Sequence, residues 1–290
     1  MSILNKNDMK YFLAMLVLIY EFSVAQIHLP ELSPEANMIE RVGYTTFKIR
    51  NGRPAARQRK IMGELVPYGK LWRTGAGKCS TIAFDTPVEI NGKAIPAGAY
   101  ALVTIPHETE WTVLLNSDTS KIYGDPKEYD TRTEVISFKV TPRKSDRYYE
   151  SLTMSIDIIR YDAVFFLSWE NTQISFPIKT RSYERAVSEI RKSLQQNPDD
   201  PERLSQAAFF YFMNNDDPQQ ILTWLDKALK AGDERWILQQ RFDILERMQK
   251  YDEAAKAAEQ SIAFLTRTKP DSWEEEVQGY KESMRRWPKR

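Results

Sequence analysis

The hydrophobic pattern of this 290-residue chain changes its period once, near Thr180. From about Ile39 to that point, short runs of β-branched and aromatic residues are separated by turn residues, which is typical of β-strands. Beyond it, apolar residues recur every three or four positions, which is typical of amphipathic helices. The sequence therefore predicts a multidomain α+β protein, with a β-domain over residues 39–180 and a helical domain over residues 181–290.

The predicted strands end in turn signals. Asn91-Gly92 favours a type I′ hairpin turn, because both central residues of that turn need a positive φ. Pro96-Ala97-Gly98 and Arg160-Tyr161-Asp162 mark two further reversals. No 12-residue helical pattern interrupts the strands, so we expect an antiparallel β-sandwich rather than a parallel α/β sheet. Strands are predicted at residues 45–49, 81–84, 111–115, 135–140, 152–158 and 163–169.

The helical part contains a weak internal repeat. Tyr183-Glu-Arg-Ala186 and Tyr251-Asp-Glu-Ala254 are similar helix openings, and Pro218-Gln-Gln-Ile221 stands at the equivalent place between them. Their spacing is close to the ~34-residue tetratricopeptide period. We predict about two and a half degenerate tetratricopeptide-like hairpins. Such hairpins either pack on the sandwich and stabilise it or offer a concave surface to a partner, and the sequence leaves both roles open.

The N-terminal residues have the pattern of a signal peptide. Lys10 precedes an apolar run over residues 11–20, and Ser23-Val24-Ala25 has small residues where a signal peptidase cleaves. The run is short for a membrane span. We predict cleavage after Ala25, export to the periplasm or beyond, and no stable membrane span in the mature protein; an uncleaved anchor is the alternative. Residues 26–38 read as an extended lead-in.

Composition excludes several classes of function. Lys and Arg total 41 against 40 Asp and Glu, and this balance argues against a general nucleic-acid or anionic-membrane binder. The single cysteine, Cys79, excludes an internal disulfide and a cysteine-based zinc cage. His28 and His107 are the only histidines, too few for the usual zinc sites. No metal and no cofactor are predicted.

Residues 74–81, Thr-Gly-Ala-Gly-Lys-Cys-Ser-Thr, superficially resemble a phosphate-binding loop. That motif needs a glycine where this chain has Trp72, and Ser or Thr where it has Cys79. It also opens a helix, whereas residues 81–84 are predicted to form a strand. We therefore predict no nucleotide site at this loop.

No catalytic constellation is evident. Arg53, Arg57, Arg59 and Lys60 form a basic cluster without interleaved aromatic residues, which favours a solvated loop. Cys79 has no evident activating base, and His107 is predicted to lie in a turn. A glycosidase needs only two carboxylates, which sequence cannot pair. The candidates are Asp85, Glu89, Asp157, Asp162 and Glu170.

An aromatic and basic run marks the candidate ligand site. Trp and Arg side chains stack on or clamp sugars, carboxylates and peptide groups. In the alternative interpretation, Trp72 fills the sandwich core and Arg73 pairs with a buried carboxylate. The candidate ligand-binding residues are Arg53, Tyr68, Trp72 and Arg73.

The same run carries a family resemblance. Gly52-Arg-Pro54 and residues 63–76, Gly-Glu-Leu-Val-Pro-Tyr-Gly-Lys-Leu-Trp-Arg-Thr-Gly-Ala, resemble the signature of the domain-of-unknown-function 2911 family. Residues 88–93, 95–100, 110–116, 168–170 and 176–178 are similar too, as are helical segments of the tail. The resemblance implies an exported protein of Bacteroidetes-type bacteria and no established activity. The chain departs from the family at Gly77-Lys78-Cys79, where members usually have Asn and then an acidic residue.

We therefore expect an exported, non-catalytic binding or scaffold protein of the bacterial periplasm or cell surface. Its partner would be an envelope glycan or protein. The alternative is a carboxylate-dependent hydrolase acting on envelope glycans, with its carboxylates near Trp72.

Overall fold

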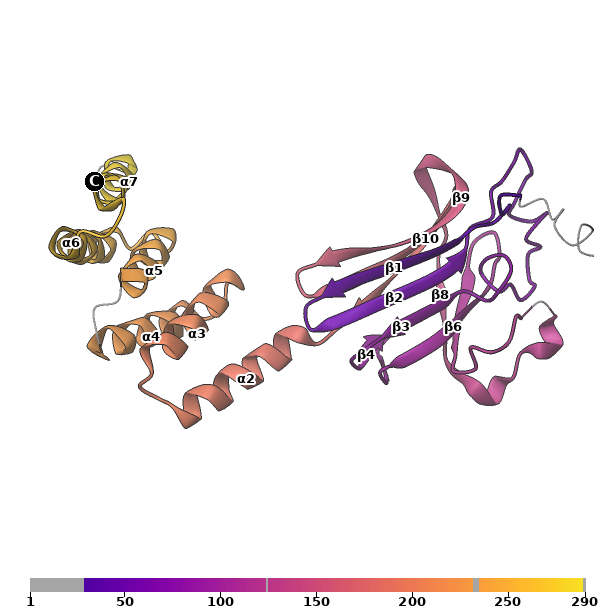
Figure 1. Cartoon of the computed structure of the whole chain (residues 1–290), viewed down its shortest axis with the longest axis horizontal. Helices are drawn as coiled ribbons and strands as arrows, with labels where there is room; N and C mark the ends of the chain where they lie inside the picture. Colours follow the sequence, from indigo (N-terminus) through magenta and orange to yellow (C-terminus); the bar gives the residue numbers. More distant parts are fainter. Residues whose placement is uncertain (1–28, 124, 232–234, 289–290) are drawn as a thin grey trace, which may run out of the picture. The chain divides into compact units, whose positions relative to one another are not determined.

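The computed structural model describes residues 29–123, 125–231 and 235–288. The predicted signal segment, its cleavage site and His28 lie outside these residues. The chain divides into two compact units, one ending at Arg181 and the other beginning at Ser182 (Figure 1). Each unit is described by itself.

The first unit contains two antiparallel sheets, as predicted. The larger has six strands in the order β1-β2-β3-β6-β7-β8: β1 (Glu35–Val42), β2 (Thr45–Gly52), β3 (Thr81–Phe84), β6 (Gly98–Ile105), β7 (Trp111–Asn116) and β8 (Glu134–Val140). The smaller has four strands in the order β5-β4-β10-β9: β5 (Lys93–Ile95), β4 (Val88–Ile90), β10 (Asp162–Lys179) and β9 (Arg143–Ile159).

Two of the predicted reversals join neighbouring strands. Asn91 (φ 49°) and Gly92 (φ 77°) form the turn between β4 and β5, and both have the positive φ that a type I′ turn requires. Arg160 (φ 60°) lies in the turn between β9 and β10, where Asp162 pairs with Ile159. The sequence prediction is confirmed at both turns.

Some strand bounds differ from the prediction. β1 begins at Glu35, inside the predicted lead-in. Its exposed residues mix polar, charged and apolar side chains (Glu35, Asn37, Ile39 and Arg41), so the strand pattern is hidden in the sequence. β9 and β10 are longer than predicted, with 17 and 18 residues. Alternating burial continues along β10 past register shifts at Glu170, as far as Ile178. These two strands form a long hairpin (Figure 1).

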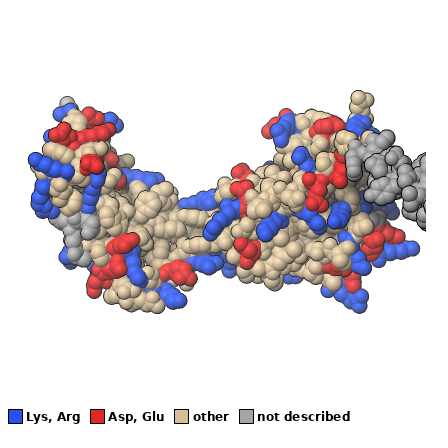
Figure 2. Space-filling view, viewed as in Figure 1, with Lys and Arg blue, Asp and Glu red and all other residues tan. Residues whose placement is uncertain are grey.

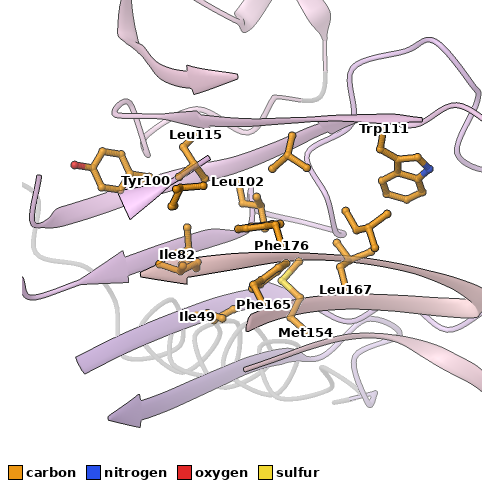
Figure 3. Close-up of a cluster of buried hydrophobic side chains, with 14 of the residues drawn as sticks. Ile49, Ile82, Tyr100, Leu102, Trp111, Leu115, Met154, Phe165, Leu167 and Phe176 are labelled. Carbon is orange, nitrogen blue, oxygen red and sulfur yellow. The ribbon is translucent and has the colours of Figure 1, made fainter. Parts of the chain in front are cut away.

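The main core lies between the two sheets (Figure 3). Side chains from the inner faces of both sheets meet there, and each buried aliphatic or aromatic side chain contributes roughly 1.5–3 kcal/mol. The largest of the fully buried residues are Trp111 of β7 and Trp169 of β10. Other members from the two sheets are Ile49, Ile82, Leu102, Leu115, Met154, Phe165, Leu167 and Phe176.

A smaller core covers the other face of the six-stranded sheet. Cys79, Ala101, Val103 and Leu114 pack there against Tyr123. Tyr123 belongs to the segment between β7 and β8, which also contains the short 3₁₀ helices η1 (Pro126–Glu128) and η2 (Thr131–Thr133). Because both faces of β6 are covered, its residues 100–104 are buried without interruption.

The second unit is helical. Its described residues form α2 (Ser182–Gln196), α3 (Pro201–Met213), α4 (Pro218–Ala231), α5 (Arg235–Arg247), α6 (Tyr251–Thr268) and α7 (Trp273–Arg286). The three similar openings in the sequence fall in the first turns of α2, α4 and α6. α3 packs against α4, and α5 packs against α6, around an apolar core. None of the helices in the described residues is long and apolar enough to cross a membrane.

Candidate functional site

A pocket of about 410 Å³ lies in the first unit. It opens where the glycine-rich segment between β2 and β3 meets Trp169 of β10 and residues 32–33 before β1. Its volume lies within the range of about 300–1,000 Å³ that is usual for small-molecule sites. It is therefore large enough for a ligand of modest size.

The wall that carries Trp72 and Arg73 is fixed by backbone hydrogen bonds to β6. The Trp72 N–H donates to the Thr104 carbonyl at 2.7 Å, and the Thr104 N–H donates to the Trp72 carbonyl at 2.9 Å. Gly69 N–H donates to the Pro106 carbonyl at 2.8 Å. Trp72 therefore pairs with the same edge of β6 as β3 does, beyond the residues 98–101 with which β3 pairs. This pairing places Arg73 at a defined position beside the sheet.

At two glycines, the backbone of the loop after Arg73 packs directly against the end of β2. A Cβ atom on Gly52 would lie 2.1 Å from the carbonyl oxygen of Ala76. A Cβ atom on Gly75 would lie 2.8 Å from Ser80 Oγ and 3.1 Å from the Gly52 carbonyl oxygen. Ser80 Oγ also donates to the Thr74 carbonyl at 2.7 Å. Only glycine permits this close backbone approach.

Three indoles connect the pocket to the main core. Trp72 stacks on Trp169 with ring centroids 5.9 Å apart and an interplanar angle of 20°. It meets Trp111 edge-on at 6.2 Å and 76°. Trp111 and Trp169 are buried, whereas Trp72 is only partly buried and lines the pocket. Trp72 therefore packs against the core and also forms part of the pocket wall.

Three arginines, Arg57, Arg59 and Arg73, line the pocket. Arg57 Nη2 donates to the Leu32 carbonyl at 2.7 Å. Arg59 donates through Nε and Nη2 to the carbonyls of residues 56 and 55, at 3.0 and 2.7 Å. Within the described residues, the Arg73 guanidinium has neither a hydrogen-bond acceptor nor an ion-pair partner. Its five donors are thus open to a ligand.

The lining of the pocket carries charge of one sign. None of the described lining residues is Asp or Glu. On the face of the molecule drawn in Figure 2, by contrast, basic and acidic side chains are interspersed. An anion would therefore meet positive charge and no carboxylate among the described lining side chains; Glu150 lies next to the lining, where its Oε1 accepts the Arg57 N–H at 2.8 Å.

Cys79 lies behind the Arg73 loop and is buried, with Sγ 3.7 Å from the Arg73 carbonyl oxygen. Burial raises the pKa of this thiol to about 12, and the charges of Arg73 and Arg50 only partly oppose the rise. The thiol is therefore protonated at neutral pH, as a packing residue is. His107 lies beside Gly69, in the predicted turn between β6 and β7.

Arg53 and Tyr68, the other two predicted site residues, do not line this pocket. Arg53 donates through Nε to the Leu152 carbonyl and through Nη2 to Thr153 Oγ1, both at 3.1 Å, and so ties the end of β2 to β9. The Tyr68 ring packs over Gly63. The structure brings together Trp72 and Arg73 but not these two residues.

Sequence reasoning missed four residues of the pocket that have charged or aromatic side chains. It placed Arg57 and Arg59 in a solvated loop, although both line the pocket. It gave no site role to Tyr123 or Trp169. Trp169 did stand in a family-like motif, and that was the one available signal for it. The alternative in which a buried carboxylate neutralises Arg73 is not found among the described residues.

The carboxylates considered for hydrolysis are engaged away from the pocket. Glu170 accepts the Ile61 N–H at 3.2 Å, and Glu89 pairs with Lys179 and Arg181. The Arg181 and Lys179 hydrogen bonds hold the pKa of Glu89 below its ordinary value. None of the five candidate carboxylates is among the described residues that line the pocket: Asp85, Glu89, Asp157, Asp162 and Glu170. Nor do three or more His, Cys, Asp or Glu gather as a metal site anywhere in the described residues.

A family model described as "Protein of unknown function (DUF2911)" matches residues 33–178. The match spans 146 of the 290 residues and ends one residue before the last residue of β10. It includes Arg57, Arg59, Arg73 and the three indoles of Trp72, Trp111 and Trp169. No curated protein and no solved structure matches the chain.

Proposed function

Since the chain belongs to the DUF2911 family, whose function is unknown, we propose a role from the pocket itself. The protein is a non-catalytic binding protein whose β-domain holds an anionic ligand against Arg73. The observation that carries this proposal is the guanidinium of Arg73, which lines the pocket without a partner among the described residues.

The chemistry of guanidinium favours this role. Its planar fork matches the two oxygens of a carboxylate or the oxygens of a phosphate, and charge-assisted hydrogen bonds are the stronger ones. Arg57 and Arg59 are already oriented by backbone carbonyls, so little side-chain entropy is lost when an anion binds. The pairing of Trp72 with Thr104 likewise fixes the backbone next to Arg73 before the ligand arrives.

The setting that we propose is the bacterial periplasm or cell surface. Two observations support it, the signal-peptide pattern ending at Ala25 and the resemblance to exported Bacteroidetes-type proteins. The ligand would then be an envelope component. We assign the tetratricopeptide-like helical unit a scaffold role toward a protein partner, supported by the repeated openings of α2, α4 and α6.

The hydrolase alternative has less support. Glycoside hydrolysis needs one carboxyl group as an acid and a second as a base or nucleophile, on either side of the scissile bond. The described lining of the pocket offers arginines in their place. This difference favours binding over hydrolysis as the role of the site.

The test compares Arg73→Gln with Arg191→Gln, the same change at an exposed position of α2. Thermal unfolding of the full chain is followed with inorganic phosphate, glucuronate and octanoate. A bound anion at a hundred times its Kd stabilises the protein by about 2.7 kcal/mol. We expect Arg73→Gln to weaken binding roughly ten- to a hundredfold, because hydrogen bonds to charged groups contribute about 1.5–3 kcal/mol.

Arg191→Gln should bind as the wild type does. The proposal fails if none of the three anions stabilises the protein, or if Arg73→Gln responds to them like the control. Release of sugar products from an envelope glycan, abolished by changing one carboxylate, would favour the hydrolase instead.

A further inference from the structure

Two exposed leucines contribute to the wall of the charged pocket. Leu32 and Leu65 line it, and they are 70% and 45% exposed. Leu71 and Trp72, both partly buried, continue this apolar surface inward. Large aliphatic side chains held in water beside a pocket mark a surface that gains free energy when a ligand covers it.

The backbone holds both exposed leucines in place. The Leu32 carbonyl accepts a hydrogen bond from Arg57 Nη2 at 2.7 Å, so a pocket arginine fixes the position of this leucine. Leu65 lies in a tight turn in which the Val66 N–H donates to the Ile61 carbonyl at 2.9 Å. Leu32 is thus tied directly to a cationic residue of the pocket, and Leu65 is held by the backbone of its own turn.

The pocket is poor in hydrogen-bond acceptors. Tyr123 Oη already donates to the Asp118 carbonyl at 2.7 Å, and Trp169 Nε1 donates to the Glu150 carbonyl at 3.3 Å. Apart from the arginines, these two aromatic residues and the Trp72 indole, which can only donate, Ser33 has the only hydrogen-bonding side-chain group in the described lining. A sugar brings many hydroxyl donors that need acceptors such as Asp, Asn, Glu or Gln. This lining provides none of those side chains.

We propose that the ligand is an amphipathic anion, a carboxylate on an aliphatic body, rather than a sugar acid or an inorganic anion. The inference rests on the proposed anion-binding function and specifies its ligand. The carboxylate pairs with Arg73, and the aliphatic body covers Leu32, Leu65 and Leu71. Both halves of such a molecule find complementary groups, whereas a hydrophilic anion leaves the leucines in water.

The test titrates the full chain with butanoate, hexanoate and octanoate below their micelle concentrations, and with glucuronate, phosphate and neutral octanamide. Burial of apolar surface predicts that Kd falls about fourfold for each added methylene. Octanoate should therefore bind more tightly than glucuronate or phosphate. Arg73→Gln should remove the preference for octanoate over octanamide.

Leu65→Ser should reduce the gain per methylene. Leu29→Ser is the matched control, because Leu29 is 78% exposed but does not line the pocket. If glucuronate binds as tightly as octanoate and still depends on Arg73, the amphipathic ligand is refuted while the anion site stands. If chain length matters but Leu65→Ser behaves like Leu29→Ser, the aliphatic body binds elsewhere and the inference is wrong. If no anion binds, the proposed function itself fails.

Discussion

Replacing Gly52 with alanine is expected to destabilise the β-domain, because the new methyl group has no space. Its carbon would lie 2.1 Å from the Ala76 carbonyl oxygen, whereas side-chain carbons in proteins essentially never approach closer than 3.0 Å. The end of β2 and the loop must therefore separate by at least 0.9 Å, and both sides of the contact are backbone. Overpacking of this kind costs about 1–3 kcal/mol.

Part of that cost is offset, since alanine loses less backbone entropy on folding than glycine, by about 0.4–1 kcal/mol. We expect a net destabilisation of about 2 kcal/mol, with the rigid contact placing the cost toward the upper end of the range. The measurement is native-state hydrogen exchange of the full chain, read by mass spectrometry on peptides from β2 and β6. These strands report the opening free energy of this unit separately from the helices.

Two glycines serve as controls for the same substitution. A Cβ atom on Gly98 would meet only the tip of the Tyr100 side chain at 3.2 Å, so Gly98→Ala should cost less than about 1 kcal/mol. Gly279 lies in α7 with open space around it, so Gly279→Ala should stabilise that helix by about 0.5–1 kcal/mol. The reasoning is refuted if Gly52→Ala leaves exchange in β2 and β6 within about 0.5 kcal/mol of the wild type.

Two further predictions concern titratable groups. At pH 8 the native protein should resist thiol alkylation at Cys79, because a pKa of about 12 in place of 9.0 lowers the thiolate fraction about a thousandfold. Mass spectrometry measures the alkylated fraction, and rapid labelling without urea would contradict the prediction. Partial desolvation by neighbouring groups, and then the charge of Glu246, raise the pKa of Asp243 to about 6. The stability that the protonated carboxyl contributes is therefore fully present at pH values below its ordinary pKa of 3.8, and it is lost as the pH rises through 6. Asp243→Asn should therefore raise Tm at pH 7 but not at pH 4, by a small amount since Asp243 is exposed to solvent. Glu259→Gln, a change at an exposed position of α6, should show no such pH-dependent gain.

Local sequence patterns predicted most of the strands, because alternate residues such as Phe47 and Ile49 are β-branched or aromatic and buried. They failed for β1, whose residues Glu35, Ile39 and Arg41 face solvent, and for β6, whose residues 100–104 are all buried and so do not alternate. They also indicated only about two and a half hairpins in the helical domain, whose described residues form six helices. In such elements, tertiary packing rather than local pattern determines the structure.

The candidate site was predictable only where it is continuous in sequence. Trp72 and Arg73 stand in one distinctive run, so local reasoning found them. Trp169 is 97 positions further along the chain, and its stacking on Trp72 depends on how the two sheets pack. Arg57 and Arg59 belong to a basic cluster whose sequence is typical of an exposed loop. Their positions in the pocket wall depend on hydrogen bonds to backbone carbonyls, which the sequence does not reveal. Which separate segments meet at the pocket is determined by the fold, so local sequence patterns could not predict it.

The loop of residues 74–80 also offers a place to attach a fluorescent probe. Its base is fixed by the contact between Gly52 and Ala76, whereas Gly77 and Lys78 at its tip are exposed, and a Cβ atom on Gly77 would touch nothing within 4 Å. Because Cys79 is the sole native cysteine and is buried, a thiol introduced by Lys78→Cys could be labelled selectively with an environment-sensitive fluorophore. The dye would sit a few residues from Arg73, so filling of the pocket could be read as an optical signal.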